Sequence, residues 1–303
     1  MTASLALGTY RIPGDELATA ARRAASCPSG WIDTAPNYCQ GRAHRLLAPV
    51  LADHPQLHIA TKAGFLTEAA AHAACTAGVI PTAKVRHSMA PGFVRWQTAR
   101  SRTELGRDRL DAVFLHNPER YQGDRHDLAG ELRAAFAVLE EAAYAQEVAA
   151  YGVATWSGFA QDAFTVPLLD RLAREAAGTP EHHLRVLQLP VSLVMDTHLG
   201  EALGGHGPIT QAADRGWEVH ASAPLHGGEL LTLATSEIAA LLKEGASVAA
   251  ACLAAAASCP GVGKVLLATG RTAHWDDALA VAGAPVIPPS TLRMVLDVLA
   301  APL

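Results

Sequence analysis

Short apolar segments alternate with longer segments of helical periodicity along the whole chain. The apolar runs cover residues 5–10, 31–35, 58–62, 112–116, 151–155, 186–190, 219–225 and 265–270. Each run is continuous rather than alternating, which is typical of strands that are buried on both faces of a parallel sheet. We therefore predict eight parallel strands.

The intervals between these runs carry the helical pattern. We predict helices over residues 15–25, 92–105, 128–146 and 166–177, and two more within residues 235–257. In the first of these, Leu17, Ala20 and Ala24 fall on one face of the helix. Gly245 separates the last two helices, and Ser247 is the expected N-cap of the second because its side chain can accept a hydrogen bond from the first turn.

Eight strand–helix repeats in 303 residues define the fold class. At roughly 100–200 residues per domain, a chain of this length forms either two domains or one large α/β barrel. Nothing in the chain resembles a long interdomain linker. We predict an α/β fold, a single (β/α)8 TIM barrel that spans residues 1–303 as one domain, with a doubly wound sheet as the competing arrangement.

The composition indicates which classes of binding partner and which cellular compartment to expect. The net charge of −5 argues against nucleic acid or an anionic membrane as a partner. The apolar run near residues 246–259 is too short to span a bilayer. The five cysteines are scattered and show no metal-ligand spacing, so we expect no metal site and a reduced, cytoplasmic chain.

Chargeable residues stand where three consecutive predicted strands end. Asp33, Lys62 and His116 occupy these positions, and Tyr38 follows Asp33 closely. In a barrel the carboxyl ends of the strands share one face, so the aspartate and the lysine should pair. If Tyr38 reaches Lys62, the ammonium lowers the pKa of the phenol and makes it a general acid. The alternative is a structural ion pair with Tyr38 and His116 packed beside it.

Several segments resemble the aldo-keto reductase family in order and spacing. Residues 31–38 read WIDTAPNY, residues 7–10 read LGTY, residues 59–62 read IATK, residues 110–118 read LDAVFLHNP, and residues 151–156 read YGVATW. Gln188 and the segment 223–225, which reads APL, continue the match. The chain is thus similar to that family over most of its length, as a bacterial member with an altered nicotinamide-binding site.

The resemblance implies an oxidoreductase that reduces a carbonyl to an alcohol with NAD(P)H, acting on a small-molecule carbonyl substrate. Tyr38 would be the general acid, Lys62 paired with Asp33 would lower its pKa, and His116 would orient the carbonyl. Tyr10, Phe65 and Trp156 are the aromatic residues that we expect to line the substrate pocket.

The cofactor side of the resemblance is less complete. The positions that correspond to cofactor-binding residues are Thr155, Gln188, Ser222, Leu225, Thr269, Arg271 and His274. Thr155 replaces the family's asparagine, Ser222 offers no ring for a nicotinamide to stack on, and His274 stands at an arginine position. Arg271 favours NADP(H), with NAD(H) as the other option.

These departures keep other functions open. One alternative is a non-redox acid–base enzyme, such as a cyclase, dehydratase or isomerase, on the same fold with weakened or lost nicotinamide binding and no cofactor. Another is a binding protein, because fold does not fix function. His87 lies outside the group formed by Asp33, Tyr38, Lys62 and His116, and we interpret it as a surface or capping residue.

Overall fold

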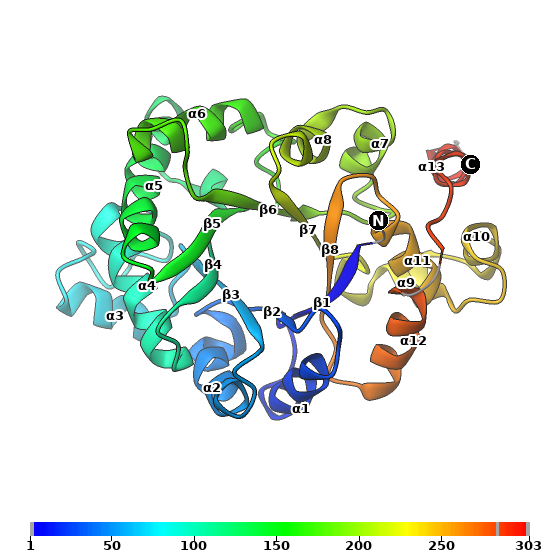
Figure 1. The fold of residues 1–303 in the computed structure, drawn as a ribbon, viewed down its shortest axis with the longest axis horizontal. Helices are drawn as coiled ribbons and strands as arrows, with labels where there is room; N and C mark the ends of the chain where they lie inside the picture. Colours follow the sequence, from blue (N-terminus) through cyan, green and yellow to red (C-terminus); the bar gives the residue numbers. More distant parts are fainter. Residues whose placement is uncertain (1–2, 283–284, 301–303) are drawn as a thin grey trace.

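The computed structural model describes residues 3–282 and 285–300. Eight parallel strands close into one barrel in chain order, and helices surround it (Figure 1). This confirms the predicted (β/α)8 fold. The strands are β1 (Ser4–Gly8), β2 (Trp31–Asp33), β3 (His58–Ala63), β4 (Leu110–His116), β5 (Val148–Ala154), β6 (Leu184–Pro190), β7 (Glu218–Ser222) and β8 (Val262–Leu267).

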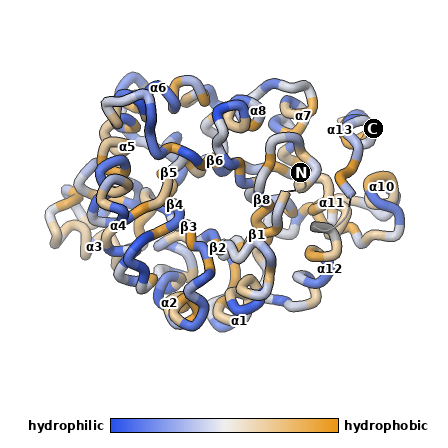
Figure 2. Tube along the Cα trace, viewed as in Figure 1, coloured by the Kyte–Doolittle hydropathy of each residue, from blue (hydrophilic) through white to orange (hydrophobic). Residues whose placement is uncertain are grey.

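The helices of the outer layer follow the strands. They are α1 (Gly14–Ala25), α2 (Ala43–Asp53), α3 (Glu68–Thr76), α4 (Pro91–Leu105), α5 (Leu128–Tyr144), α6 (Val166–Ala177), α7 (Thr197–Leu203), α8 (Gly207–Asp214), α9 (Leu230–Leu233), α10 (Ser236–Leu242), α11 (Val248–Ala257), α12 (Thr272–Ala282) and α13 (Pro289–Ala300). Hydrophobic and hydrophilic residues alternate along many of them (Figure 2), as expected of helices that pack one face on a barrel.

Local sequence explains where helices begin. Thr67, Thr165, Thr235 and Ser247 accept hydrogen bonds from backbone N–H groups in the first turns of α3, α6, α10 and α11. The predicted N-cap at Ser247 and the break near Gly245 are therefore confirmed. In α1, the residues at helical spacing, Leu17, Ala20 and Ala24, are buried against the barrel as predicted.

Five strands end earlier than the apolar runs predict. β1 ends at Gly8, β2 at Asp33, β5 at Ala154, β7 at Ser222 and β8 at Leu267, so the residues that follow lie in loops. At the end of β7 the reason is local, because Ala223 has a φ of 49° and Pro224 has no N–H to donate to a ladder. These residues therefore belong to the loops of the carboxyl-end face, where TIM barrels carry their sites.

Two segments lie outside the regular repeat. Residues 64–90 form a long excursion between β3 and α4 that contains α3. Its Leu66 and Ile80 pack with Phe93 of α4 in a small apolar cluster apart from the main core. At the other side of the ring, α13 lies at the periphery near α7 and α10 (Figure 1). Within the described ranges, no helix has the length and apolarity needed to cross a bilayer.

Candidate active site

The carboxyl ends of β2 and β3 hold a buried ion pair. Lys62 Nζ donates to Asp33 Oδ1 at 2.5 Å and to the Thr34 carbonyl oxygen at 3.0 Å. Gln188 at the end of β6 donates from Nε2 to the second oxygen of Asp33, Oδ2, at 2.8 Å. Asp33 is thus hydrogen-bonded through both oxygens, which offsets the cost of burying its charge. The predicted pairing of Asp33 with Lys62 is present.

Tyr38 lies directly beside this pair. Lys62 Nζ is 5.3 Å from the centroid of the Tyr38 ring, and Tyr38 begins a short 3-10 helix, Tyr38–Gly41, in the loop after β2. Burial, with smaller contributions from Asp33 and Tyr10, raises the pKa of Tyr38 well above its usual value. The sequence predicts a lowering of this pKa by Lys62, whereas the net shift is upward because burial dominates.

His116 completes the group at the end of β4. Its ring centroid is 6.1 Å from that of Tyr38, and the two rings meet edge to face. Burial, together with Lys62 and His87, holds the pKa of His116 well below its usual value, so the imidazole is neutral. Nδ1 is buried without a hydrogen-bond partner, which leaves Nε2 as the ring nitrogen that reaches solvent. The structure therefore brings all four residues predicted to be catalytic into one cluster.

The three predicted pocket aromatics surround this cluster at different distances. The Tyr10 ring centroid lies 5.2 Å from that of Tyr38, and the Phe65 centroid lies 4.8 Å from that of His116. Trp156 is exposed in the loop after β5, where its ring lies 6.2 Å from that of His226. Tyr10 and Phe65 thus flank the reacting groups, and Trp156 lies farther out on the same face.

His87 lies against this cluster: it is not on the surface, and its contact with a strand-end carbonyl is the capping use that we expect from the sequence. The excursion 64–90 folds back so that His87 is half-buried and bonds through Nε2 to the carbonyl oxygen of His116 at 2.8 Å. Phe65 packs between the two imidazoles. A Cβ at Gly64, whose φ is 153°, would lie 2.9 Å from the His116 carbonyl oxygen and 3.0 Å from His87 Nε2. Only glycine permits this close approach.

Glu119 organises the loop after β5, and no sequence pattern pointed to it. Its carboxylate accepts from Thr155 Oγ1 at 2.9 Å and from the backbone N–H groups of Trp156 and Ser157 at 2.9 and 3.0 Å. Thr155 Oγ1 also accepts from the N–H of Gly158. Thr155 therefore gives its hydroxyl proton to Glu119 rather than facing the site with a free donor.

The remaining predicted cofactor residues lie at the ends of β6, β7 and β8. Gln188 commits its Nε2 to Asp33, so its Oε1 is the atom that can accept from a carboxamide. Ser222 ends β7 half-buried, and Leu225 follows it in the loop. Position 222 therefore offers no aromatic ring on which a nicotinamide could stack.

The segment after β8 is a local hydrogen-bonded unit. Thr269 Oγ1 contacts His274 Nδ1 at 3.0 Å and accepts from the N–H of Arg271 at 3.2 Å. Arg271 itself is exposed. A Cβ at Gly270 would lie 1.9 Å from Glu16 Oε2, so a carboxylate from α1 packs against this loop. The three predicted residues are together, but no described contact links them to Tyr38 or Lys62.

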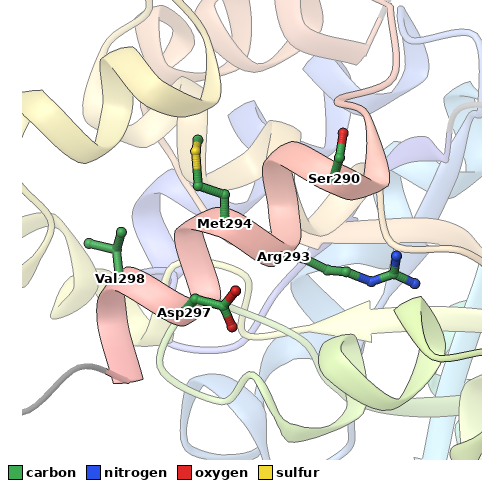
Figure 3. A pocket seen from close by; sticks show the side chains of 5 residues that line it. All are labelled: Ser290, Arg293, Met294, Asp297 and Val298. Carbon is green, nitrogen blue, oxygen red and sulfur yellow. The ribbon is translucent and has the colours of Figure 1, made fainter.

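Other features of the described chain do not compete with this face. A shallow concavity on α13 is lined by Ser290, Arg293, Met294, Asp297 and Val298 (Figure 3). It lies outside the ring and shares no residue with the site. Among the described residues there is also no cluster of three or more His, Cys, Asp or Glu side chains that could hold a metal ion.

Comparison with known proteins now identifies the class. The model of the aldo/keto reductase family matches residues 2–295, so the chain belongs to that family. Family members use nicotinamide cofactors and act on small-molecule substrates. The comparison with curated proteins gives no match.

Solved structures show the same fold at low identity. A glycerol dehydrogenase from Gluconobacter oxydans is 19% identical, with a TM-score of 0.70 over 98% of this chain and 91% of that chain. An aldo-keto reductase from Bacillus halodurans in its holo form is 16% identical, with a TM-score of 0.67 over 99% and 93%. An aldo/keto reductase from Klebsiella pneumoniae in complex with NADP and acetate is 18% identical, with a TM-score of 0.66 over 99% and 92%.

Proposed function

We propose that this protein is an NAD(P)H-dependent carbonyl reductase in which Tyr38 is the general acid. The observation that carries the proposal is the connected group at one end of the barrel. Gln188 and Lys62 hold both oxygens of Asp33, and Tyr38 and the neutral His116 lie beside the pair. An acid, a charged support for it and a neutral hydrogen-bonding group are what carbonyl reduction requires of a protein.

The roles follow from these contacts. A nicotinamide, when bound, would supply the hydride for the carbonyl carbon. As the C=O π electrons move to oxygen, Tyr38 Oη donates its proton there and leaves a phenolate beside Lys62. The raised pKa keeps that proton on Tyr38 at neutral pH, and the forming alkoxide is a far stronger base than phenolate. In its Nε2–H tautomer, His116 donates to the same carbonyl oxygen and orients it.

The residues present can hold the nicotinamide end of the cofactor. Gln188 Oε1 has no partner of its own and would accept from the carboxamide, while Arg271 would contact a phosphate. Ser222 and Thr155 give no equivalent support, because one has no ring and the other is bonded to Glu119. We propose NADP(H) as the cofactor with NAD(H) as the alternative, and a cytoplasmic location.

Titration of the purified protein with NADPH and NADH tests this proposal. We expect a Kd below about 100 μM for at least one of them, measured by calorimetry or fluorescence. Tyr38→Phe should keep that affinity and lose about 10²–10⁴-fold in kcat on any carbonyl that the wild type reduces. Tyr144→Phe, an exposed tyrosine on α5, is the matched control. Absence of binding at millimolar nucleotide would refute the reductase.

A further inference from the structure

His116 and Gln188 stand in one row of the barrel, with an alanine between them. His116 on β4 is the register partner of Ala154 on β5, and Ala154 is the partner of Gln188 on β6. Two backbone bonds continue the ladder beyond this row. The Asn117 N–H donates to the Ala154 carbonyl oxygen at 2.6 Å, and the Thr155 N–H donates to the Gln188 carbonyl oxygen at 2.9 Å. The end of β5 therefore connects two of the residues on which the proposed reaction depends.

Glu119 fixes this end of β5 from the neighbouring loop. Asn117 adopts a left-handed conformation, with a φ of 50°, and a short 3-10 helix, Pro118–Arg120, follows it directly. This turn brings the Glu119 carboxylate to the loop after β5. There it accepts from the Thr155 hydroxyl and from the next two backbone N–H groups, at 2.9–3.0 Å.

The Glu119 carboxylate is committed to this loop. Among the described side chains no basic group forms an ion pair with it, so three donors from one loop hold its charge. Hydrogen bonds to an ionised acceptor are roughly twice as strong as neutral ones. Thr155 Oγ1 also accepts from the Gly158 N–H at 2.8 Å, and a Cβ at Gly158 would lie 2.7 Å from that oxygen. The carboxylate thus organises a tight turn that begins directly beside the row of His116 and Gln188.

We infer that Glu119 is a positioning residue, which holds His116 and Gln188 in place through the end of β5. The inference rests on the proposed reductase function, in which His116 orients the carbonyl and Gln188 accepts from the nicotinamide carboxamide. Thr155 gives its hydroxyl proton to Glu119, so its support for the cofactor is indirect: its N–H fixes the Gln188 carbonyl. The connection reaches the ion pair, because Gln188 Nε2 donates to Asp33 Oδ2 at 2.8 Å.

Two ligands that differ only in the nicotinamide test the link to Gln188. The probes are NADPH and 2′-phospho-ADP-ribose, or NADH and ADP-ribose if the protein prefers NAD(H). We expect Glu119→Gln to raise the Kd of the dinucleotide about tenfold by calorimetry, the factor that one lost hydrogen bond gives, and to leave the Kd of the fragment within about twofold. Glu119→Ala should raise the first Kd further. Glu181→Gln, at an exposed glutamate in the loop before β6, removes the same charge at the other end of the barrel and should change neither Kd.

Hydrogen exchange of the protein without ligand tests the link itself. In Glu119→Ala we expect the N–H groups of Thr155 and Asn117 to exchange about tenfold faster than in the wild type, measured by NMR. The N–H groups of Phe114 and Val186, farther back on β4 and β6, should keep their rates. A purely structural role would instead lower the global stability and raise all four rates together.

Kinetics test the link to His116. On a carbonyl that the wild type reduces, we expect kcat at saturating nucleotide to fall about tenfold in Glu119→Gln and to stay unchanged in Glu181→Gln. An unchanged kcat in Glu119→Gln would overturn the link to His116. An unchanged dinucleotide Kd, or an equal rise for both ligands, would overturn the link to Gln188.

Failure of the proposed function gives a different signature. If neither NADPH nor NADH binds to the wild type at millimolar concentration, the reductase is refuted, and hydrogen exchange still decides the role of Glu119. Faster exchange confined to Thr155 and Asn117 in Glu119→Ala then supports the positioning role without the cofactor. Unchanged exchange at both positions overturns it.

Discussion

The barrel contains a lysine–carboxylate pair at each end, and the two pairs are used differently. At the carboxyl end, Lys62 and Asp33 are almost fully enclosed, with side-chain exposures of 1% and 5%, and they lie beside Tyr38. At the amino end, Lys264 pairs with Glu218, whose side chain is 39% exposed. Only four lysines occur in the chain, and two of them form these pairs.

The surroundings of the pairs explain the difference. Lys264 Nζ lies 4.4 Å from the centroid of the Trp31 ring, and Trp31 stacks on His58. His220, fully buried, shares the other oxygen of Glu218 at 3.0 Å. Aromatic rings therefore flank the charges at the amino end, while Glu218 stays partly exposed to solvent. At the carboxyl end, the Tyr38 phenol and the His116 imidazole flank the pair of Lys62 and Asp33 instead. A pair of the same charges can therefore support proton transfer there.

Replacing each lysine in turn should give the largest effects. It should distinguish the proposed catalytic role of the carboxyl-end pair from the structural role of the amino-end pair. Lys62→Met leaves Asp33 buried and uncompensated, so we expect a loss of about 3–5 kcal/mol in unfolding free energy and a kcat that falls by about 10²–10⁴-fold. Lys264→Met should cost less stability, because Glu218 reaches solvent, and should leave kcat/KM near the wild-type value. Denaturant unfolding and steady-state kinetics measure both.

The double variant Asp33→Asn with Lys62→Met distinguishes the loss of a catalytic group from a folding defect. It removes both charges, so we expect it to regain part of the lost stability while remaining inactive. Equal losses of activity in Lys62→Met and Lys264→Met would contradict the division of roles between the two ends.

A smaller effect is expected at His87. This residue lies in the excursion 64–90 and bonds to the His116 carbonyl oxygen at the end of β4. We expect His87→Ala to lower kcat/KM by about tenfold, because the His116 carbonyl loses a donor and the imidazole of His116 loses its fixed position. His87→Gln should restore most of the activity, since its amide can donate to the same oxygen. His72→Ala, at an exposed histidine on α3, is the control, and a similar loss there would point to general disruption of the excursion.

The smallest effect that we expect is a loss of stability at low pH through the amino-end pair of Lys264 and Glu218. Its hydrogen bonds to His220 and Lys264 outweigh the opposing effect of burial and hold the pKa of Glu218 near 2, below its ordinary value of 4.5. A carboxylate with a depressed folded-state pKa stabilises the fold above its unfolded pKa, and this stabilisation is lost as pH falls through the folded value. We expect thermal stability to drop between about pH 4.5 and 2, and Glu218→Gln to flatten part of that drop. An identical pH profile in the variant would exclude Glu218 as a contributor.

The carboxyl-end cluster could be predicted because its residues interrupt apolar strands at their ends. A polar residue after a continuous apolar run is visible in the sequence, and the barrel then brings Asp33, Lys62 and His116 to one face. The contributions of His87 and Glu119 depend on how loops from different repeats fold over that face, which periodicity does not encode. The direction of the Tyr38 pKa also depends on the packing, since burial is the largest cause of its rise.

The excursion 64–90 has a consequence for engineering. Its apolar residues pack with Phe93 of α4 in a cluster separate from the main core, and it meets His116 through Gly64 and His87. A segment whose apolar contacts are confined to one small cluster shared with α4 can be varied without disturbing the main core. Libraries that vary the stretch between Phe65 and His87, with Gly64 and His87 kept, would reshape one wall of the entrance while the four residues at the strand ends stay in place.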